Sequence, residues 1–173
     1  MKTLILGGVR SGKSRLAERL AAAAGAPVCY IATARDSGDD ELRARIAAHR
    51  ARRPPHWALV EAPLALAAAL RREAAAGRVV IVDCLTLWLT NLLCEADAAG
   101  IEREREALLD AVPALPGTLI LVANETGLGI VPLGALTRRY VDEAGVLHQR
   151  LAERCERVLL TVAGLPLALK GSL

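Results

Sequence analysis

A glycine-rich run followed by lysine and serine lies near the start of the chain. Gly7, Gly8, Val9, Arg10, Ser11, Gly12, Lys13 and Ser14 match the spacing G-x-x-x-x-G-K-[ST] in full. Glycines let backbone amides curl around a phosphate, the lysine can reach the β and γ phosphates, and the serine hydroxyl can bind Mg²⁺. A glycine turn that binds nothing is the alternative. Because the run follows an apolar segment and opens a helical pattern, it predicts a phosphate-binding loop.

An acidic residue ends a second apolar segment further along. Asp83 follows Val79–Val82, where a carboxylate could hold Mg²⁺ through water. It could equally cap a helix that begins at Cys84 and Leu85, and the two roles do not exclude each other. Ser14 and Asp83 are therefore the candidate metal-binding residues.

A histidine lies within a strongly basic segment. Leu42, Ile46 and His49 share one stripe at helical spacing, and arginines flank them at positions 43, 45, 50, 52 and 53. The arginines could simply form a solvated helix face, and His49 could be a satisfied core residue. Beside a nucleotide site, however, a neutral imidazole is a good nucleophile for an activated phosphate, and guanidinium groups would stabilise the developing charge.

Short apolar runs alternate with helical patterns along the chain, which predicts the elements that position these residues. Strands are expected at 3–6, 28–32, 57–60, 79–82 and 118–123, and helices at 14–24, 39–52, 64–76, 85–95, 102–112 and 133–154. The long last helix carries Leu136, Tyr140, Ala144, Leu147 and Leu151 on one stripe. Runs 158–162 and 167–169 flank Gly164 as a C-terminal antiparallel hairpin. Strands that are apolar throughout predict a mainly parallel sheet covered by helices on both faces, an α/β fold in one domain over residues 1–173.

Composition excludes several classes of protein. With 53% hydrophobic and 24% charged residues among 173, the chain is globular and not disordered. Single-strand nucleic-acid binding needs several aromatic platforms, and only Trp57, Trp88, Tyr30 and Tyr140 are present. The net charge of +3 is too mild to indicate a polyanion partner. We therefore expect no nucleic-acid partner.

Cysteine spacing and hydropathy indicate a compartment. The cysteines are far apart and form no CxxC pair, which favours reduced thiols over zinc or disulfides. No uncharged apolar run approaches the ~18 residues of a membrane span, and no signal peptide is recognisable. We expect a soluble cytoplasmic protein.

Further motifs along the chain carry a family resemblance. After the phosphate loop come Tyr30-Ile31-Ala32-Thr33, an Arg-Ile-x-x-His block ending in Arg53-Pro54-x-His56-Trp57, the block Asn124-Glu125-x-Gly127-x-Gly129-Ile130-Val131-Pro132, and Gln149-Arg150-Leu151-Ala152. In this order they resemble the bifunctional adenosylcobinamide kinase/adenosylcobinamide-phosphate guanylyltransferase family of cobalamin biosynthesis. The resemblance spans almost the entire chain.

This resemblance implies two reactions. ATP or GTP phosphorylates the aminopropanol hydroxyl of adenosylcobinamide, with Lys13 and Mg²⁺ at the phosphates. GTP then guanylylates a histidine, and GMP passes to adenosylcobinamide phosphate to give adenosylcobinamide-GDP. The guanylylated histidine of the family motif falls on His49.

The resemblance also implies contacts, fold and assembly. GTP contacts carry over to Gly7 through Ser14 and to Ala32, Thr33, Ala34, Arg50, Ala51, Arg52, Arg53, Glu61 and Asp83. The implied fold is a RecA-like P-loop domain, and the implied assembly is a homotrimer. Asn124 and Glu125 could face the second substrate or the magnesium, or could only fix the turn around Gly127 and Gly129.

Several parts of the chain depart from the family pattern. Asp83 stands where at least some relatives are expected to carry Glu, and His148 stands where the family pattern leads us to expect Asn. The segment Arg50-Ala51-Arg52-Arg53 is more basic than the Lys-Asp-Gly-Arg type, which bears on base specificity. None of these changes removes a group that the chemistry needs.

Two other functions fit part of the pattern. Another P-loop small-molecule kinase would explain Lys13, Ser14 and Asp83, but it would leave His49 and the loop 124–132 without a role. A non-catalytic nucleotide switch would use the glycine-rich loop to signal to a partner. A covalent, acid-labile nucleotide on the protein would separate the bifunctional enzyme from both.

Overall fold

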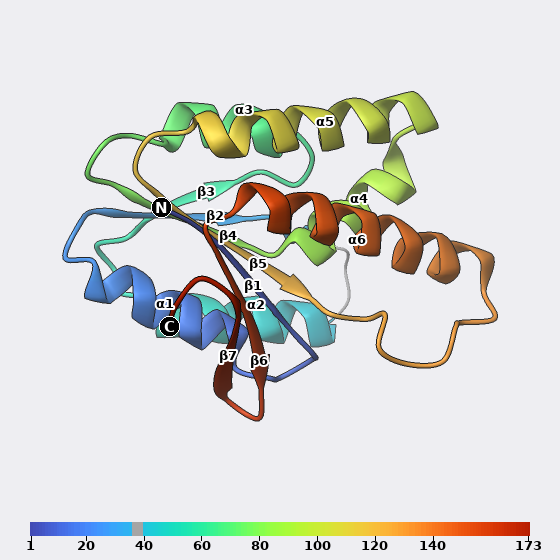
Figure 1. The fold of residues 1–173 in the computed structure, drawn as a ribbon, viewed down its shortest axis with the longest axis horizontal. Helices are drawn as coiled ribbons and strands as arrows, with labels where there is room; N and C mark the ends of the chain where they lie inside the picture. The colour runs from blue at the N-terminus through green and yellow to red at the C-terminus, as the bar shows by residue number, and fades with distance from the viewer. Residues whose placement is uncertain (36–39) are drawn as a thin grey trace.

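A seven-stranded sheet forms the centre of the molecule in the computed structural model, which describes residues 1–35 and 40–173 (Figure 1). Side chains 41, 42, 45, 49 and 52 also lie outside the described part. The strands are β1 Lys2–Gly7, β2 Val28–Ala32, β3 Ala58–Glu61, β4 Val79–Asp83, β5 Thr118–Asn124, β6 Arg157–Val162 and β7 Leu165–Lys170. The helices are α1 Lys13–Ala23, α2 Asp40–Arg52, α3 Leu66–Glu73, α4 Leu85–Glu95, α5 Ala98–Ala114 and α6 Ala135–Arg154.

The strands follow the order β3-β2-β4-β5-β1-β6-β7. All neighbouring pairs are parallel except β6 and β7, which form the predicted antiparallel hairpin. The α/β fold with a mainly parallel sheet is confirmed.

Helices cover both faces of the sheet, as apolar parallel strands require. In Figure 1, α3, α4, α5 and α6 lie above the sheet and α1 and α2 below it. Trp88, Leu108 and Leu147 belong to the core on the first face, whereas Leu16 and Ala17 of α1 pack on the second. No helix in the described ranges is long and apolar enough to cross a membrane.

The apolar stripe predicted for the last long helix, α6, is buried or half-buried except at its first residue. Ala144, Leu147 and Leu151 of α6 are buried, but Leu136 is 56% exposed. The start of α6 projects past the sheet in Figure 1, so its first turn has little apolar surface beneath it. Helix α5 also begins earlier than predicted, at Ala98, where the Asp97 side chain accepts a hydrogen bond from the Gly100 amide (2.7 Å).

Parallel pairing brings the predicted functional residues to one edge. The carboxyl ends align so that Gly7 pairs with Asn124 and Ala32 pairs with both Glu61 and Asp83. The carboxyl edge of an open α/β sheet is where such folds bind ligands.

Candidate active site

The loop between β1 and α1 is tightly packed, and its glycines are needed for that packing. A Cβ on Gly7 would lie 2.5 Å from Ser11 Oγ and 2.6 Å from the Thr161 carbonyl oxygen. Gly12 has a φ of +97°, and a Cβ there would lie 3.1 Å from Gly164 Cα. Side chains at either position would displace backbone, which accounts for the glycines of the motif.

The loop leads directly into α1, which begins at Lys13. Amide groups at a helix start are unpaired within the helix and carry the positive end of its dipole, so this end attracts an anion. The Lys13 side chain is buried, and its ammonium group donates to the Gly8 carbonyl (3.0 Å). Lysine and helix end together supply the charge that a phosphate group needs.

A cavity of about 850 Å³ opens over this loop. Its lining draws on the phosphate loop, the ends of β2, β4 and β5, helix α2 and the turn between β6 and β7. The lining includes Val9, Arg10, Ser11, Gly12, Lys13, Ser14, Arg15, Tyr30, Ala32, Ala34, Ile46, Ala48, Arg53, Asp83, Cys84, Thr86, Leu87, Asn124, Ala163 and Gly164. Predicted residues from distant parts of the sequence thus share one cavity.

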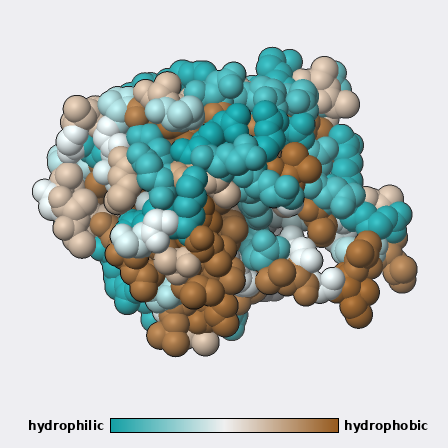
Figure 2. Space-filling model, viewed as in Figure 1, coloured by the Kyte–Doolittle hydropathy of each residue, from teal (hydrophilic) through white to brown (hydrophobic). Residues whose placement is uncertain are grey.

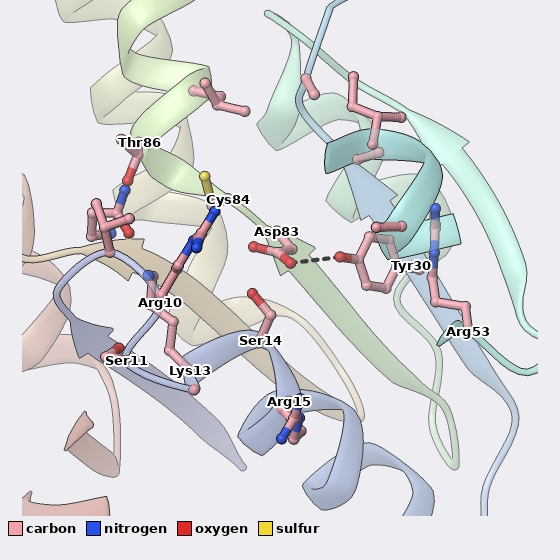
Figure 3. A pocket seen from close by; sticks show the side chains of 18 of the residues that line it. Arg10, Ser11, Lys13, Ser14, Arg15, Tyr30, Arg53, Asp83, Cys84 and Thr86 are labelled. Atoms are coloured by element: carbon pink, nitrogen blue, oxygen red, sulfur yellow. Dashed lines mark hydrogen bonds between the residues drawn. The ribbon is translucent and has the colours of Figure 1, made fainter. Parts of the chain in front are cut away.

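A tyrosine joins two of the predicted groups (Figure 3). Tyr30 Oη donates to the Asp83 carboxylate at 2.6 Å, and the Arg53 guanidinium lies 4.2 Å from the centre of the Tyr30 ring. Burial, and secondly the charge of Asp83, raise the pKa of Tyr30 well above its usual range. Tyr30 therefore remains a protonated donor that orients Asp83, while its ring supports Arg53.

Ser14 and Asp83 fit a magnesium ion. Figure 3 shows the Ser14 hydroxyl and the Asp83 carboxylate facing each other across the cavity. Within the described part of the chain, no three His, Cys, Asp or Glu side chains gather as a metal site. Magnesium needs no such cluster, because it keeps waters and uses one or two protein ligands together with substrate phosphates. The residues present suit a nucleotide-borne Mg²⁺.

Thr33 makes structural contacts, whereas its neighbours Ala32 and Ala34 line the cavity. Its hydroxyl donates to the Cys84 carbonyl (2.6 Å) and accepts from the Cys84 amide (3.0 Å). The Thr33 carbonyl accepts from the Asn91 side-chain amide at 2.9 Å. These bonds fasten the segment after β2 to the start of α4, and so fix the cavity wall.

Helix α2 contributes Ile46 and Ala48 to the cavity. His49 belongs to this helix, but its side chain lies outside the described residues, as does that of Arg52. Arg50 forms an exposed ion pair with Glu61 (2.9 Å), and Ala51 is exposed. Among the described residues that line the cavity, the basic segment is represented by Arg53.

The last residue of β5, Asn124, and the residue after it, Glu125, have different contacts. Asn124 lines the cavity, and its backbone amide donates to the Thr86 hydroxyl (2.8 Å). Glu125 Oε1 accepts from the Gly127 amide at 2.6 Å, and Oε2 lies 3.8 Å from His148 Nδ1. Burial lowers the pKa of His148, with Glu125 opposing this shift. Glu125 thus contacts the turn at Gly127, where a structural role was one of the two roles considered for it.

Sequence reasoning did not identify Tyr30, Thr86 or the hairpin turn as parts of this cavity. The register Ala32 to Asp83 shows that Tyr30 and Asp83 lie on adjacent strands, but sequence alone does not fix which strands are neighbours. The signal that could have been used is a tyrosine two residues before the end of the strand that follows the phosphate loop and its helix in the chain.

The sequence is clearly similar to one protein family and to individual proteins of known description. The model of the family described as cobinamide kinase/cobinamide phosphate guanyltransferase matches residues 3–169. The bifunctional adenosylcobalamin biosynthesis protein CobP of Pseudomonas aeruginosa is 68% identical over 171 residues, covering 99% of this chain and 98% of that protein. The protein CobU of Escherichia coli, of the same description, is 38% identical over 183 residues, covering 98% and 100%.

A solved structure extends the fold comparison. The RadB recombinase superposes with a TM-score of 0.52 at 17% identity, covering 92% of this chain and 73% of that chain. At that identity the likeness concerns the fold alone, and it agrees with the expected RecA-like arrangement.

Proposed function

Because the chain belongs to the cobinamide kinase/cobinamide phosphate guanyltransferase family, we propose that it phosphorylates adenosylcobinamide and then attaches GMP to the product through a guanylyl-histidine at His49. The observation that carries this proposal is the shared cavity, in which residues of the phosphate loop and of α2 line the same space. A kinase needs only the first set, whereas nucleotidyl transfer to a residue of α2 needs both.

In the kinase step, the acceptor hydroxyl attacks the γ phosphorus of ATP or GTP. A new phosphorus–oxygen bond forms, the bond to the β-phosphate oxygen breaks, the nucleoside diphosphate leaves and the hydroxyl proton passes to solvent. The Lys13 ammonium donates a hydrogen bond to the Gly8 carbonyl in this structure, and it would exchange that partner for the β and γ phosphates when a nucleotide binds. Charge stabilisation and positioning dominate the catalysis of such transfers.

Ser14 and Asp83 are the residues that would hold Mg²⁺, through the hydroxyl and through a water, respectively. When bound, the ion neutralises charge on the β and γ phosphates. Tyr30 supports this role because its hydroxyl donates to one oxygen of Asp83 and so holds the carboxylate in place.

In the guanylyl step, a ring nitrogen of neutral His49 attacks the α phosphorus of GTP, and pyrophosphate leaves. A phosphate oxygen of adenosylcobinamide phosphate then attacks the same phosphorus, the phosphorus–nitrogen bond breaks and the imidazole is regenerated. Arg53, held over Tyr30, and Arg50 and Arg52 would balance the charge of the leaving pyrophosphate. Glu61 would accept hydrogen bonds from the guanine base.

The assembly proposed for this enzyme is a homotrimer in the cytoplasm, where nucleoside triphosphates are available. Apolar side chains support self-association: Figure 2 shows hydrophobic surface over the β6–β7 hairpin and over the loop before α6. Leu165, Leu167 and Leu169 of β7 are all more than half exposed, as is Ile130 of the loop. Contiguous exposed apolar surface of this kind is typical of interfaces between chains.

The proposal is tested by following the corrinoid through both steps. The enzyme is incubated with adenosylcobinamide, Mg²⁺ and ATP, then with GTP, and the corrinoid is analysed by mass spectrometry. We expect a product heavier by a phosphoryl group after ATP, and by a further GMP unit after GTP. Phosphorylation without GMP addition would leave a kinase, and no change in mass in either step would overturn the proposal.

A further inference from the structure

The turn between β6 and β7 lines the cavity, and its hairpin lies on the other side of β1 from β2 and β3, the two strands that α2 connects. Ala163 and Gly164 of this turn line the same space as Lys13 and Ser14. They come from the far end of the sequence and belong to none of the motifs discussed above. Their position in the cavity lining allows them to contact a nucleotide bound at the phosphate loop.

Backbone contacts fix the turn to the phosphate loop. The Gly164 amide donates to the Ser11 carbonyl at 2.9 Å. Gly164 Cα approaches Gly12 so closely that a Cβ on Gly12 would lie 3.1 Å away. The distance between the turn and a phosphate bound in the loop is therefore set by the fold.

The conformation of the turn is unusual for its sequence. Ala163 has a φ of 52° and Gly164 a φ of 81°, the positive pair of a type I′ hairpin turn, which favours Asn or Gly at the first position. Alanine there costs about 1–2 kcal/mol in backbone strain. Strained residues of this kind concentrate at ligand sites, and here a small apolar side chain lies on a cavity wall.

Strand order gives the direction in which a triphosphate would extend. Strand β4, which ends in Asp83, lies on one side of β1, and the β6–β7 hairpin lies on the other. The γ phosphate, together with Mg²⁺, belongs on the side of Asp83 and Ser14. In the kinase step, the α phosphate and the nucleoside of the donor then extend away from Asp83, toward the hairpin turn.

We propose that Ala163 and Gly164 form the contact surface for the nucleoside of the phosphoryl donor in the kinase step. The assignment rests on the proposed function. The cavity would then have two nucleoside positions, one on each side of the phosphate loop. The nucleoside of the phosphoryl donor would lie at the hairpin turn, and the guanosine that is transferred would lie on the side of α2. The hairpin surface is made of backbone and a methyl group, so it would hold the sugar and the base by packing.

The test compares binding of ATP with binding of inorganic tripolyphosphate, which has the phosphates but no nucleoside, by calorimetry in the presence of Mg²⁺. The variants are Gly164→Asn and, separately, Ala163→Asn, because asparagine tolerates left-handed backbone and nothing lies within 4 Å of a Cβ at Gly164. The matched control is Gly25→Asn, at φ +62° with equally open surroundings, beyond the end of α1.

We expect each hairpin variant to weaken ATP binding at least tenfold while tripolyphosphate binding stays within about twofold, and the control to match the wild type. Equal effects on both ligands, or no effect on ATP, would overturn the assignment. If the wild type binds neither ligand, the proposed nucleotide site itself fails, which is a distinct result.

Discussion

At the scale of single residues, Tyr30 carries the most specific prediction. Tyr30→Phe removes the hydroxyl that orients Asp83 and keeps the ring beneath Arg53. A hydrogen bond to a charged group contributes about 1.5–3 kcal/mol, so we expect the apparent Mg²⁺ affinity in the kinase reaction to fall about tenfold. Tyr140→Phe is the control, because Tyr140 is not among the described residues that line the cavity. Identical Mg²⁺ titrations for the two variants would argue against this role.

His148 predicts a pH dependence of stability. Burial depresses its pKa in the folded state below the ordinary 6.5, so the unfolded chain binds the proton more readily. The stability that this group contributes is complete above 6.5 and is lost as the pH falls through that value, by up to about 1.4 kcal/mol per pH unit. Urea unfolding of the wild type and of His148→Asn, from about pH 8 to about pH 5.5, should show the steeper loss in the wild type. Parallel curves would contradict this account.

At the scale of elements, the contact between α2 and β3 offers a variant that tests the two proposed reactions separately. Arg50 and Glu61 form an exposed ion pair, with the Glu61 side chain 62% exposed, and such pairs contribute only about 0.2–1 kcal/mol. We therefore expect Glu61→Gln to unfold like the wild type. Its labelling by GTP should fall at least about tenfold if Glu61 binds guanine, with ATP-driven phosphorylation within about twofold.

The matched control is Glu95→Gln, which removes the partner of Arg35 in another exposed ion pair. Equal loss of both activities in Glu61→Gln would indicate a damaged fold, and wild-type labelling would remove Glu61 from the guanine site.

The strands of the sheet could be predicted from the sequence, but their order in the sheet could not. Apolar runs such as Val79–Val82 identify buried parallel strands, and the acid that ends the run must then reach the ligand edge. The partners of Asp83 could not be predicted, because the Tyr30 contact depends on β2 lying beside β4, far apart in sequence. The proximity of the hairpin turn to the phosphate loop likewise arises from β6 pairing with β1. Long-range strand order carries this information, and local patterns do not.

At the scale of the whole molecule, the exposed leucines of β7 predict assembly. Leu167→Lys adds a charge at a side chain that is 57% exposed. If this face is buried between chains, the variant should have the 18.3 kDa mass of a monomer by light scattering, whereas the wild type should have the mass of a trimer. The control is Leu59→Lys on β3, at the opposite edge of the sheet. A monomeric wild type, or a trimeric Leu167→Lys variant, would contradict this role for β7.

The central claim is the covalent intermediate, because it separates the bifunctional enzyme from a kinase and from a switch. The most direct measurement incubates the protein with Mg²⁺ and GTP labelled at the α phosphate, followed by a denaturing gel, beside α-labelled ATP and the His49→Ala variant. We predict label that requires GTP, survives alkali but not acid, and is absent from His49→Ala. A folded wild type that binds GTP and retains no label would contradict the guanylyl-histidine.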